Sequence, residues 1–274
     1  MKKITIAFLL TLLLFFTFTS IGFTLSPEND LDPTSFKVKV LPWEQVNSIL
    51  PKKSKFTIID VESGLSFDVQ RRAGNSHADV QPLTHRDTKI MKTIYNGKWS
   101  WRRRAIIVLT DDRMIAASMH GMPHGAGALQ NGFPGHFCVH FSGSTTHGLK
   151  NADPAHKLMV IKAGGILDHY LSKIDPFEMM QVLEVAINQR DEKIMNRIVY
   201  ENDHHSFKKS FSDIQMIKFD LKPNSIIEEK QMVVNMRIPA MVMTCKNQIE
   251  KRYYDVSLWR DFGSGQWYFV PPEK

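Results

Sequence analysis

The stretch RRRAIIVLTDDRMIAASMHG, residues 102–121, sets the expected fold of the N-terminal half of the chain. Two apolar runs flank the acidic pair DD at 111–112, and such runs around a short polar turn are typical of paired strands. The stretch KFTIIDVESGLSFDVQRR, residues 55–72, has the same organisation around ESG at 62–64. Two strand pairs in succession predict a mainly β domain with little helix.

Helical patterns occur in two other places. The stretch PLTHRDTKIMKTIYNG, residues 82–97, predicts a short helix with Thr84 as its N-cap and an end at Gly97. The stretch FEMMQVLEVAINQRDEKIMNRIV, residues 177–199, carries apolar residues at helical spacing and predicts a long amphipathic helix. Alternating apolar and polar segments follow this helix to the C-terminus, so we expect a separate small α+β domain there.

These patterns divide the 274 residues into five parts. They are a signal peptide or membrane anchor (1–25), a linker (26–35), a β-rich domain (36–155), a connecting helix or linker (156–174) and an α+β domain (175–274). Lys2 and Lys3 precede an uncharged apolar run at 4–25, which predicts export, with cleavage and retention as an anchor both open. The protein is therefore expected outside the cytoplasm, secreted or anchored to the cell membrane by residues 4–25.

The chain is basic, with a formal net charge of +7 and a sequence pI of about 9.3. An exported protein meets anionic wall polymers and lipid head groups, so peptidoglycan or another anionic envelope polymer is the expected partner, and nucleic acid is not. Basic clusters at 51–55 and 99–105 are where such contact would concentrate.

The two cysteines, Cys138 and Cys245, lie in different surroundings. In an oxidising compartment they could form one disulfide. Cys245 ends the apolar run AMVMTC, which suits a buried inert thiol, whereas Cys138 lies among glycines and histidines. This difference favours a chemical role for Cys138.

The stretch HGMPHGAGALQNGFPGHFCVHF, residues 120–141, offers several kinds of chemistry. Seven of the eleven histidines fall within residues 76–147, and the density of glycine implies a tightly turning backbone. An extended HFCVH would present His136, Cys138 and His140 on one face, which makes a three-ligand zinc site possible. Alternatively, an imidazole beside Cys138 would lower the pKa of the thiol and create a nucleophilic thiolate.

The pattern HG at 120–121 and GHFCVH at 135–140, with fourteen residues between His120 and Gly135, resembles the catalytic motif of the L,D-transpeptidases. That motif is His-Gly, a loop, then Ser/Thr-His-Gly-Cys, a hydrophobic residue, and Asn or Arg. The resemblance implies a small β-rich fold without a cofactor, in which Cys138 is the acyl-accepting nucleophile, His120 its base and His136 a residue lining the site. The positions expected to contact substrate are Gly121, Gly135, His140 and Trp101.

Three positions depart from the family pattern: Gly135 replaces Ser or Thr, Phe137 replaces Gly, and His140 replaces Asn or Arg. Phe137 matters most, because glycine adopts backbone conformations that a bulky residue rarely does. The spacing selects His120 as the base, since a loop that started at His124 would be too short for the pattern.

Two wider resemblances extend this interpretation. The pattern from HADVQPLT at 77–84 to THG at 146–148 resembles a family of bacterial exported proteins that often carry wall-binding modules. The long helix and the closing WRDFGSGQWYFVPP at 259–272 resemble nuclear-transport-factor-like domains, in which a helix packs on a curved sheet. The first resemblance would add further residues to the same site, namely His77, Asp79, Trp99 and His147.

The expected function is therefore that of an exported wall enzyme. A cysteine-dependent acyl transfer on peptidoglycan stem peptides, of the L,D-transpeptidase or carboxypeptidase type, is what the resemblance implies. A zinc-dependent wall hydrolase that uses the histidine cluster is an alternative, and a non-catalytic protein that binds an envelope glycan or peptide is another.

Overall fold

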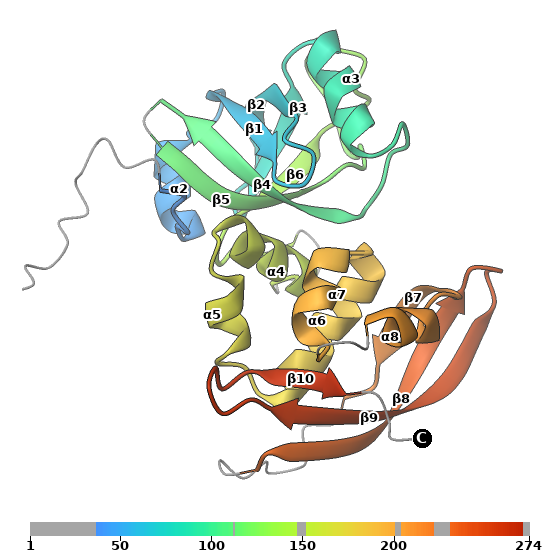
Figure 1. Cartoon of the computed structure of the whole chain (residues 1–274). Coiled ribbons are helices and arrows are strands. Elements are labelled where there is room, and N and C mark those ends of the chain that lie inside the picture. Colours follow the sequence, from blue (N-terminus) through green and yellow to red (C-terminus); the bar gives the residue numbers. More distant parts are fainter. Residues whose placement is uncertain (1–36, 112, 147–151, 201–203, 222–230, 271–274) are drawn as a thin grey trace, which may run out of the picture. The chain divides into compact units, whose positions relative to one another are not determined.

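Six antiparallel strands close into a barrel in the order β1-β2-β3-β6-β5-β4 (Figure 1). Their bounds are β1 Lys55–Asp60, β2 Ser66–Ala73, β3 Ala78–Pro82, β4 Arg103–Thr110, β5 Arg113–His120 and β6 Phe137–His140. β4 and β5 pair in unbroken register from Arg103 opposite His120 to Thr110 opposite Arg113. The stretch 102–121 therefore forms the predicted strand pair, and the N-terminal half is mainly β, as the sequence predicts.

The structure is a computed structural model that describes residues 37–111, 113–146, 152–200, 204–221 and 231–270. The predicted export segment and linker lie outside the described residues, as does His147. Within the described ranges, no helix combines the length and apolar character that a bilayer crossing requires.

Alternate residues of each strand point into the barrel, as the period of two along a strand dictates. The interior is apolar and includes Ile58, Val69, Val80, Ile106, Ala117, Met119, Phe137 and Val139. On β6, Phe137 and Val139 belong to this core, so Cys138 and His140 face the outside of the barrel. This alternation places the chemically interesting side chains of β6 together on one outer face.

Two helices flank the barrel strands in the sequence. Helix α3, His85–Ile94, begins with a capping box in which Thr84 and Asp87 bond each other's backbone N–H groups, so the predicted N-cap is confirmed. Helix α2, Trp43–Ile49, was not predicted; it buries Trp43 and Val46 against the barrel core. Upstream of α2, Lys39 forms an isolated bridge with Ile115 of β5.

A buried ion pair lies where β1 and β4 run alongside each other. Asp60 is fully buried and accepts two hydrogen bonds of 2.6 Å from the guanidinium of Arg104. Glu62 lies 2.9 Å from the same guanidinium, and Ser63 donates both its N–H and its hydroxyl to Asp60. Because both acceptor and donor are satisfied, this charged pair is tolerated inside the fold.

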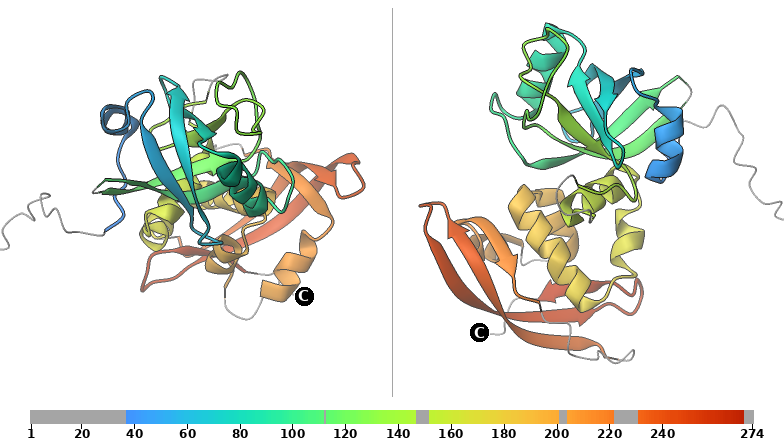
Figure 2. Two further views of the ribbon diagram at one scale, coloured as in Figure 1. Left: turned by 90° about the horizontal axis from the view of Figure 1, so that it is seen from above. Right: turned by 180° about the vertical axis from the view of Figure 1, so that it is seen from behind.

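The C-terminal part combines helices with a four-stranded antiparallel sheet in the order β10-β9-β8-β7. The elements are α4 Pro154–Ala163, α5 Leu167–Leu171, α6 Pro176–Gln189, α7 Glu192–Ile198, α8 His204–Ser210, β7 Ile214–Phe219, β8 Val233–Thr244, β9 Ile249–Arg260 and β10 Trp267–Val270. Helices α6 and α7 pack against one face of this curled sheet (Figure 2). The helix-then-strands order agrees with the predicted α+β character.

The predicted long helix at 177–199 is two helices. Helix α6 ends at Arg190, whose φ of 52° is left-handed, and Asp191 then caps the N-terminus of α7. Helix α4, in the segment predicted as a connecting helix or linker (156–174), packs against the outer face of β4 and β5, with Ala105 and Ala116 in the shared core. It therefore closes over the same side of the barrel to which Cys138 and His140 point.

Candidate functional site

The candidate site is built on three neighbouring strands, β3, β6 and β5. Asp79 of β3 pairs with Cys138 of β6, and His140 of β6 pairs with Ser118 of β5. The same registers place His77 beside His140 and His120 beside Cys138. Because these positions share the outward-facing parity, the sheet presents a patch of buried polar side chains rather than an apolar surface.

The thiol of Cys138 lies close to the imidazoles of both His120 and His124, and its hydrogen-bond contact is with His124. Its Sγ lies 3.3 Å from Nε2 of His124. The other ring nitrogen, Nδ1, lies 3.1 Å from the carbonyl oxygen of Met122 and must donate to it, since a carbonyl only accepts. The neutral ring therefore turns a lone pair on Nε2 toward the thiol.

On the opposite side of the thiol lies a carboxylate with its own imidazole. Oδ1 of Asp79 is 3.8 Å from Cys138 Sγ and 3.1 Å from His77 Nε2. His77 Nδ1 lies 2.8 Å from the carbonyl oxygen of Thr145, so it donates there and directs Nε2 to the carboxylate. Nε2 and the carboxylate oxygen are both natural acceptors, so a proton or a cation is needed between them.

Burial controls the charge states of the site. Burial raises the pKa of the Cys138 thiol, and the neighbouring Asp79 carboxylate raises it further. Burial lowers the pKa of His120 to about 2, and the nearby His124 acts in the same direction. The resting site therefore holds a protonated thiol and a neutral His120, rather than a thiolate–imidazolium pair.

A stack of imidazole rings extends the site to helix α4. The rings of His77 and His140 stack at 4.5 Å, and His140 stacks on His156 at 3.8 Å. His156 is buried and its Nδ1 bonds the hydroxyl of Ser118 at 2.9 Å. Burial lowers the pKa of His156 well below its usual value. The sequence predicted the helix but not this ring in the site, since His156 lies outside the glycine-histidine stretch.

Glycines shape the loop that carries His124 over the thiol. His124 and His136 exchange two backbone hydrogen bonds of 2.9 Å, which closes the loop on itself. At Gly135 the φ of 123° and a carbonyl oxygen of His124 only 2.5 Å from a would-be Cβ leave no room for a side chain. A Cβ at Gly121 would overlap the ring of Tyr95. Both predicted glycines thus permit close backbone packing.

The remaining predicted residues lie around this centre. His136 is half-buried, with Nε2 3.9 Å from Asp79, and Trp101 is 49% exposed with its ring 4.7 Å from that of His120. Trp99 does not join them; its ring packs on Phe133 at 5.1 Å. Phe137, the most serious departure from the motif, points into the barrel core and away from the thiol.

Two triads of possible metal ligands share Cys138. One is completed by His77 and His140 and the other by His120 and His124, and within each triad the ligand atoms lie within 4.8 Å of one another. The triad predicted from the sequence, His136 with Cys138 and His140, is not one of these two. His136 faces Asp79 instead, although all three residues lie on the face that the alternation predicts.

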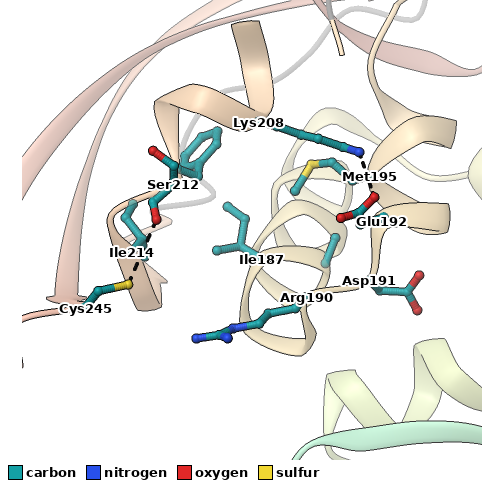
Figure 3. Close-up of a pocket in the computed structure, with 11 residues that line it drawn as sticks. Ile187, Arg190, Asp191, Glu192, Met195, Lys208, Ser212, Ile214 and Cys245 are labelled. Atoms are coloured by element: carbon teal, nitrogen blue, oxygen red, sulfur yellow. Dashed lines mark hydrogen bonds and ion pairs between the residues drawn. The ribbon is translucent and has the colours of Figure 1, made fainter. Parts of the chain in front are cut away.

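Cys245 lies in a different setting, on the C-terminal sheet side of a cavity of about 340 Å³ (Figure 3). Ile187, Met195 and Ile214 give the cavity apolar walls, and the ion pair between Lys208 and Glu192 spans one side. Cys245 is exposed, not buried as its apolar run suggested. Neither cysteine of the chain forms a disulfide in this structure.

Comparison with protein-family models, with curated proteins and with solved structures finds no match to this chain.

Proposed function

We propose that the protein is an extracytoplasmic cysteine acyltransferase that acts on the peptide stems of the cell wall, with Cys138 as nucleophile and His124 as base. The observation that carries this proposal is the 3.3 Å contact between Cys138 Sγ and His124 Nε2, with Nδ1 held by the Met122 carbonyl. A nucleophile, a base and a group that orients the base are the three parts that covalent catalysis requires. The export-like N-terminal run supports the location.

In the first half-reaction, Sγ of Cys138 attacks the carbonyl carbon of a stem-peptide bond. His124 Nε2 takes the thiol proton as the C–S bond forms, then returns it to the nitrogen of the terminal amino acid as the C–N bond breaks. The product is a thioester on Cys138 and a released amino acid. Because the resting thiol is protonated, proton removal accompanies the attack instead of preceding it.

In the second half-reaction, an acceptor amine of a neighbouring stem, or water, attacks the thioester. His124 accepts the proton of the acceptor and donates it back to Sγ as the C–S bond breaks, which restores the starting site. Trp101, exposed beside His120 and His124, offers a flat wall against which a substrate chain can lie. The basic surface favours an anionic polymer as substrate.

Intact-mass measurement after incubation with a carbapenem tests the proposal. The strained ring is attacked as the peptide bond would be, so the full-length protein gains the mass of one opened carbapenem. Cys138→Ala loses this adduct, and the matched variant Cys245→Ala retains it. Absence of the adduct together with absence of turnover of wall tetrapeptides would overturn the proposal and leave the binding-protein alternative.

A further inference from the structure

A second concave site lies in the C-terminal part and has no role in the acyl-transfer mechanism. It is a cavity of about 400 Å³ between the end of α7 and the paired strands β9 and β10. Its lining includes three aromatic and three polar residues, namely Tyr200, Trp259, Tyr268, Asn196, Arg197 and Asp261. Small-molecule sites in proteins occupy about 300–1,000 Å³, so this cavity has the size of a small-ligand site.

The alternation of the strands brings the three aromatic side chains together. Trp259 of β9 lies directly opposite Tyr268 of β10, so both point to the same face of the sheet. Their neighbours Leu258 and Phe269 point to the other face, into the core shared with α6 and α7. The backbone N–H of Tyr200 donates to the carbonyl of Phe269 at 3.0 Å, which places Tyr200 beside β10. Three neighbouring backbone segments thus contribute one aromatic ring each.

The three rings form a right-angled corner. The ring of Tyr200 is 5.1 Å from that of Trp259 and 6.1 Å from that of Tyr268, and its plane is inclined by 78° to both. Tyr200 is 41% exposed and the other two are half-buried, so ring surface remains accessible. The face of an aromatic ring is electronegative and attracts weakly positive C–H groups. A flat ligand with C–H groups on one side fits this corner.

Polar side chains beside the rings offer both donors and acceptors. Oδ2 of Asp261 accepts two hydrogen bonds of 2.7 Å, from the N–H and the hydroxyl of Ser264, and these bonds hold the carboxylate in place. A carboxylate accepts about four bonds, so Asp261 keeps capacity for a ligand hydroxyl. Arg197 pairs with Asp168 through one of its five N–H groups, and the exposed amide of Asn196 supplies a donor and an acceptor.

We infer that this cavity binds a sugar ring of a glycan chain, with one C–H face on the aromatic side chains and the hydroxyl groups bonded by the polar ones. Each sugar hydroxyl is both donor and acceptor, and the cavity supplies the matching groups. Proline-rich peptides also dock on aromatic side chains, but they run along an extended groove. The right-angled corner, with a carboxylate, an amide and a guanidinium beside it, therefore favours the sugar.

Binding is inferred from the cavity alone, and only its consequence for the enzyme rests on the proposed function. A bound glycan strand would hold the protein on the polymer whose peptide stems Cys138 modifies. The C-terminal part would then raise the local concentration of stems around the barrel, without taking part in the chemistry.

Isothermal titration calorimetry of the full-length protein tests the inference. The probes are chitotetraose, a β-1,4-linked oligomer of N-acetylglucosamine, and cellotetraose, which has the same linkage without the acetamido groups. We expect saturable binding of at least one oligomer. Trp259→Ala and Tyr200→Ala should weaken it at least about tenfold, since they remove the stacking surface. Tyr200→Phe keeps the ring and should retain most of the affinity.

The matched control is Tyr253→Ala, because Tyr253 is also an exposed aromatic residue on the outer face of β9 but does not line the cavity. This variant should bind as the wild type does. Near-ultraviolet circular dichroism shows whether each variant keeps its packing. Asn196→Ala, at an exposed position, tests the polar side without disturbing the rings and should weaken binding about fivefold.

The outcomes separate the glycan site from the acyltransferase. No saturable binding of either oligomer, or binding that is unchanged in both Trp259→Ala and Tyr200→Ala, overturns the inference. Binding of a proline-rich peptide in place of the sugars, lost in the same two variants, overturns it as well. Cys138→Ala should bind the oligomer as the wild type does. Sugar binding without carbapenem adducts would therefore reject the acyltransferase alone, and adducts without sugar binding would reject the glycan site alone.

Discussion

The two thiols of this chain differ in almost every physical respect. Cys138 is 3% exposed, lies on a barrel strand, and contacts His124 and Asp79. Cys245 is exposed at a cavity, and its nearest polar contact is the carbonyl of Ser212 at 4.0 Å. The less accessible thiol is therefore the one that lies beside an imidazole and a carboxylate.

The same contrast holds for the charged groups of the two regions. The barrel buries the pair of Asp60 and Arg104, whereas the C-terminal sheet keeps the pair of Asp213 and Arg252 near solvent. Both groups of the Asp60 pair are held by bonds within the protein, whereas water competes for the groups of the Asp213 pair. The Asp60 pair is therefore the one at which the substitution of one polar atom has a large effect.

The reactivity of the two thiols toward a small disulfide reagent is expected to differ most. Burial and the raised pKa of Cys138 leave little thiolate there, so its reaction at pH 8 is expected to be slower than that of the exposed Cys245 by at least about tenfold. Stopped-flow measurement with the metal-free protein should show one fast thiol, which Cys245→Ser removes. Equal rates would show that the barrel opens freely and would break the comparison.

The two ion pairs give the next largest difference. Asp60→Asn leaves the buried guanidinium of Arg104 with only the partly exposed Glu62 as counter-charge and is expected to lower the free energy of unfolding by about 3 kcal/mol. Asp213→Asn, on the exposed pair, changes it by no more than about 0.5 kcal/mol. Urea denaturation at pH 7 measures both, and similar losses would contradict the contrast.

The pH dependence of the barrel follows from the same pair. Although burial acts to raise it, the hydrogen bonds from Arg104 and Ser63 hold the pKa of Asp60 below its ordinary value of 3.8. A carboxylate with a lowered folded pKa stabilises the protein above its unfolded pKa, and this stabilisation is lost as the pH falls through the folded pKa. The wild type should therefore lose stability more steeply than Asp60→Asn below about pH 4.

The sequence predicted that Cys138 and His140 lie on one face of β6, but it did not predict that His124 and His156 contact that face. Strand alternation suffices to place Cys138 and His140 together, because it depends only on neighbouring residues. The contact with His124 depends on how the glycine-rich loop closes through its bridge to His136, and loop closure is not encoded in spacing. His156 reaches the site only through the packing of α4 on the barrel, which no local pattern specifies.

Two other elements show the same limit. The left-handed residue at Arg190 interrupts a helical pattern that continues unbroken in the sequence, since no glycine or proline marks the end of α6. Phe137 occupies the position at which the family motif has glycine, but its side chain points into the barrel core. Its direction follows from the pleat and could have been deduced from Cys138 facing outward.

Substitution of the proposed base is expected to change the rate of carbapenem acylation of Cys138. His124→Gln should slow carbapenem acylation of Cys138 by about a hundredfold, because the amide keeps the size of the side chain but removes the basic nitrogen. His120→Gln should slow it less than about tenfold, since burial keeps the pKa of His120 near 2 and leaves it a weak base. Stopped-flow acylation rates decide between them, and the reverse order would restore His120 as the base.

The smallest expected effect lies in the C-terminal region, at Arg190. Its φ of 52° at the end of α6 is unfavourable for a residue with a side chain, and glycine adopts it without strain. Arg190→Gly should therefore stabilise the protein by about 0.5–1 kcal/mol, after the larger entropy of glycine in the unfolded chain is subtracted. Urea denaturation measures the gain, and the rate of carbapenem acylation should be unchanged because Arg190 lines the cavity beside Cys245. A slower acylation in this variant would mean that a substitution beside Cys245 affects the site around Cys138. The two regions would then not act independently.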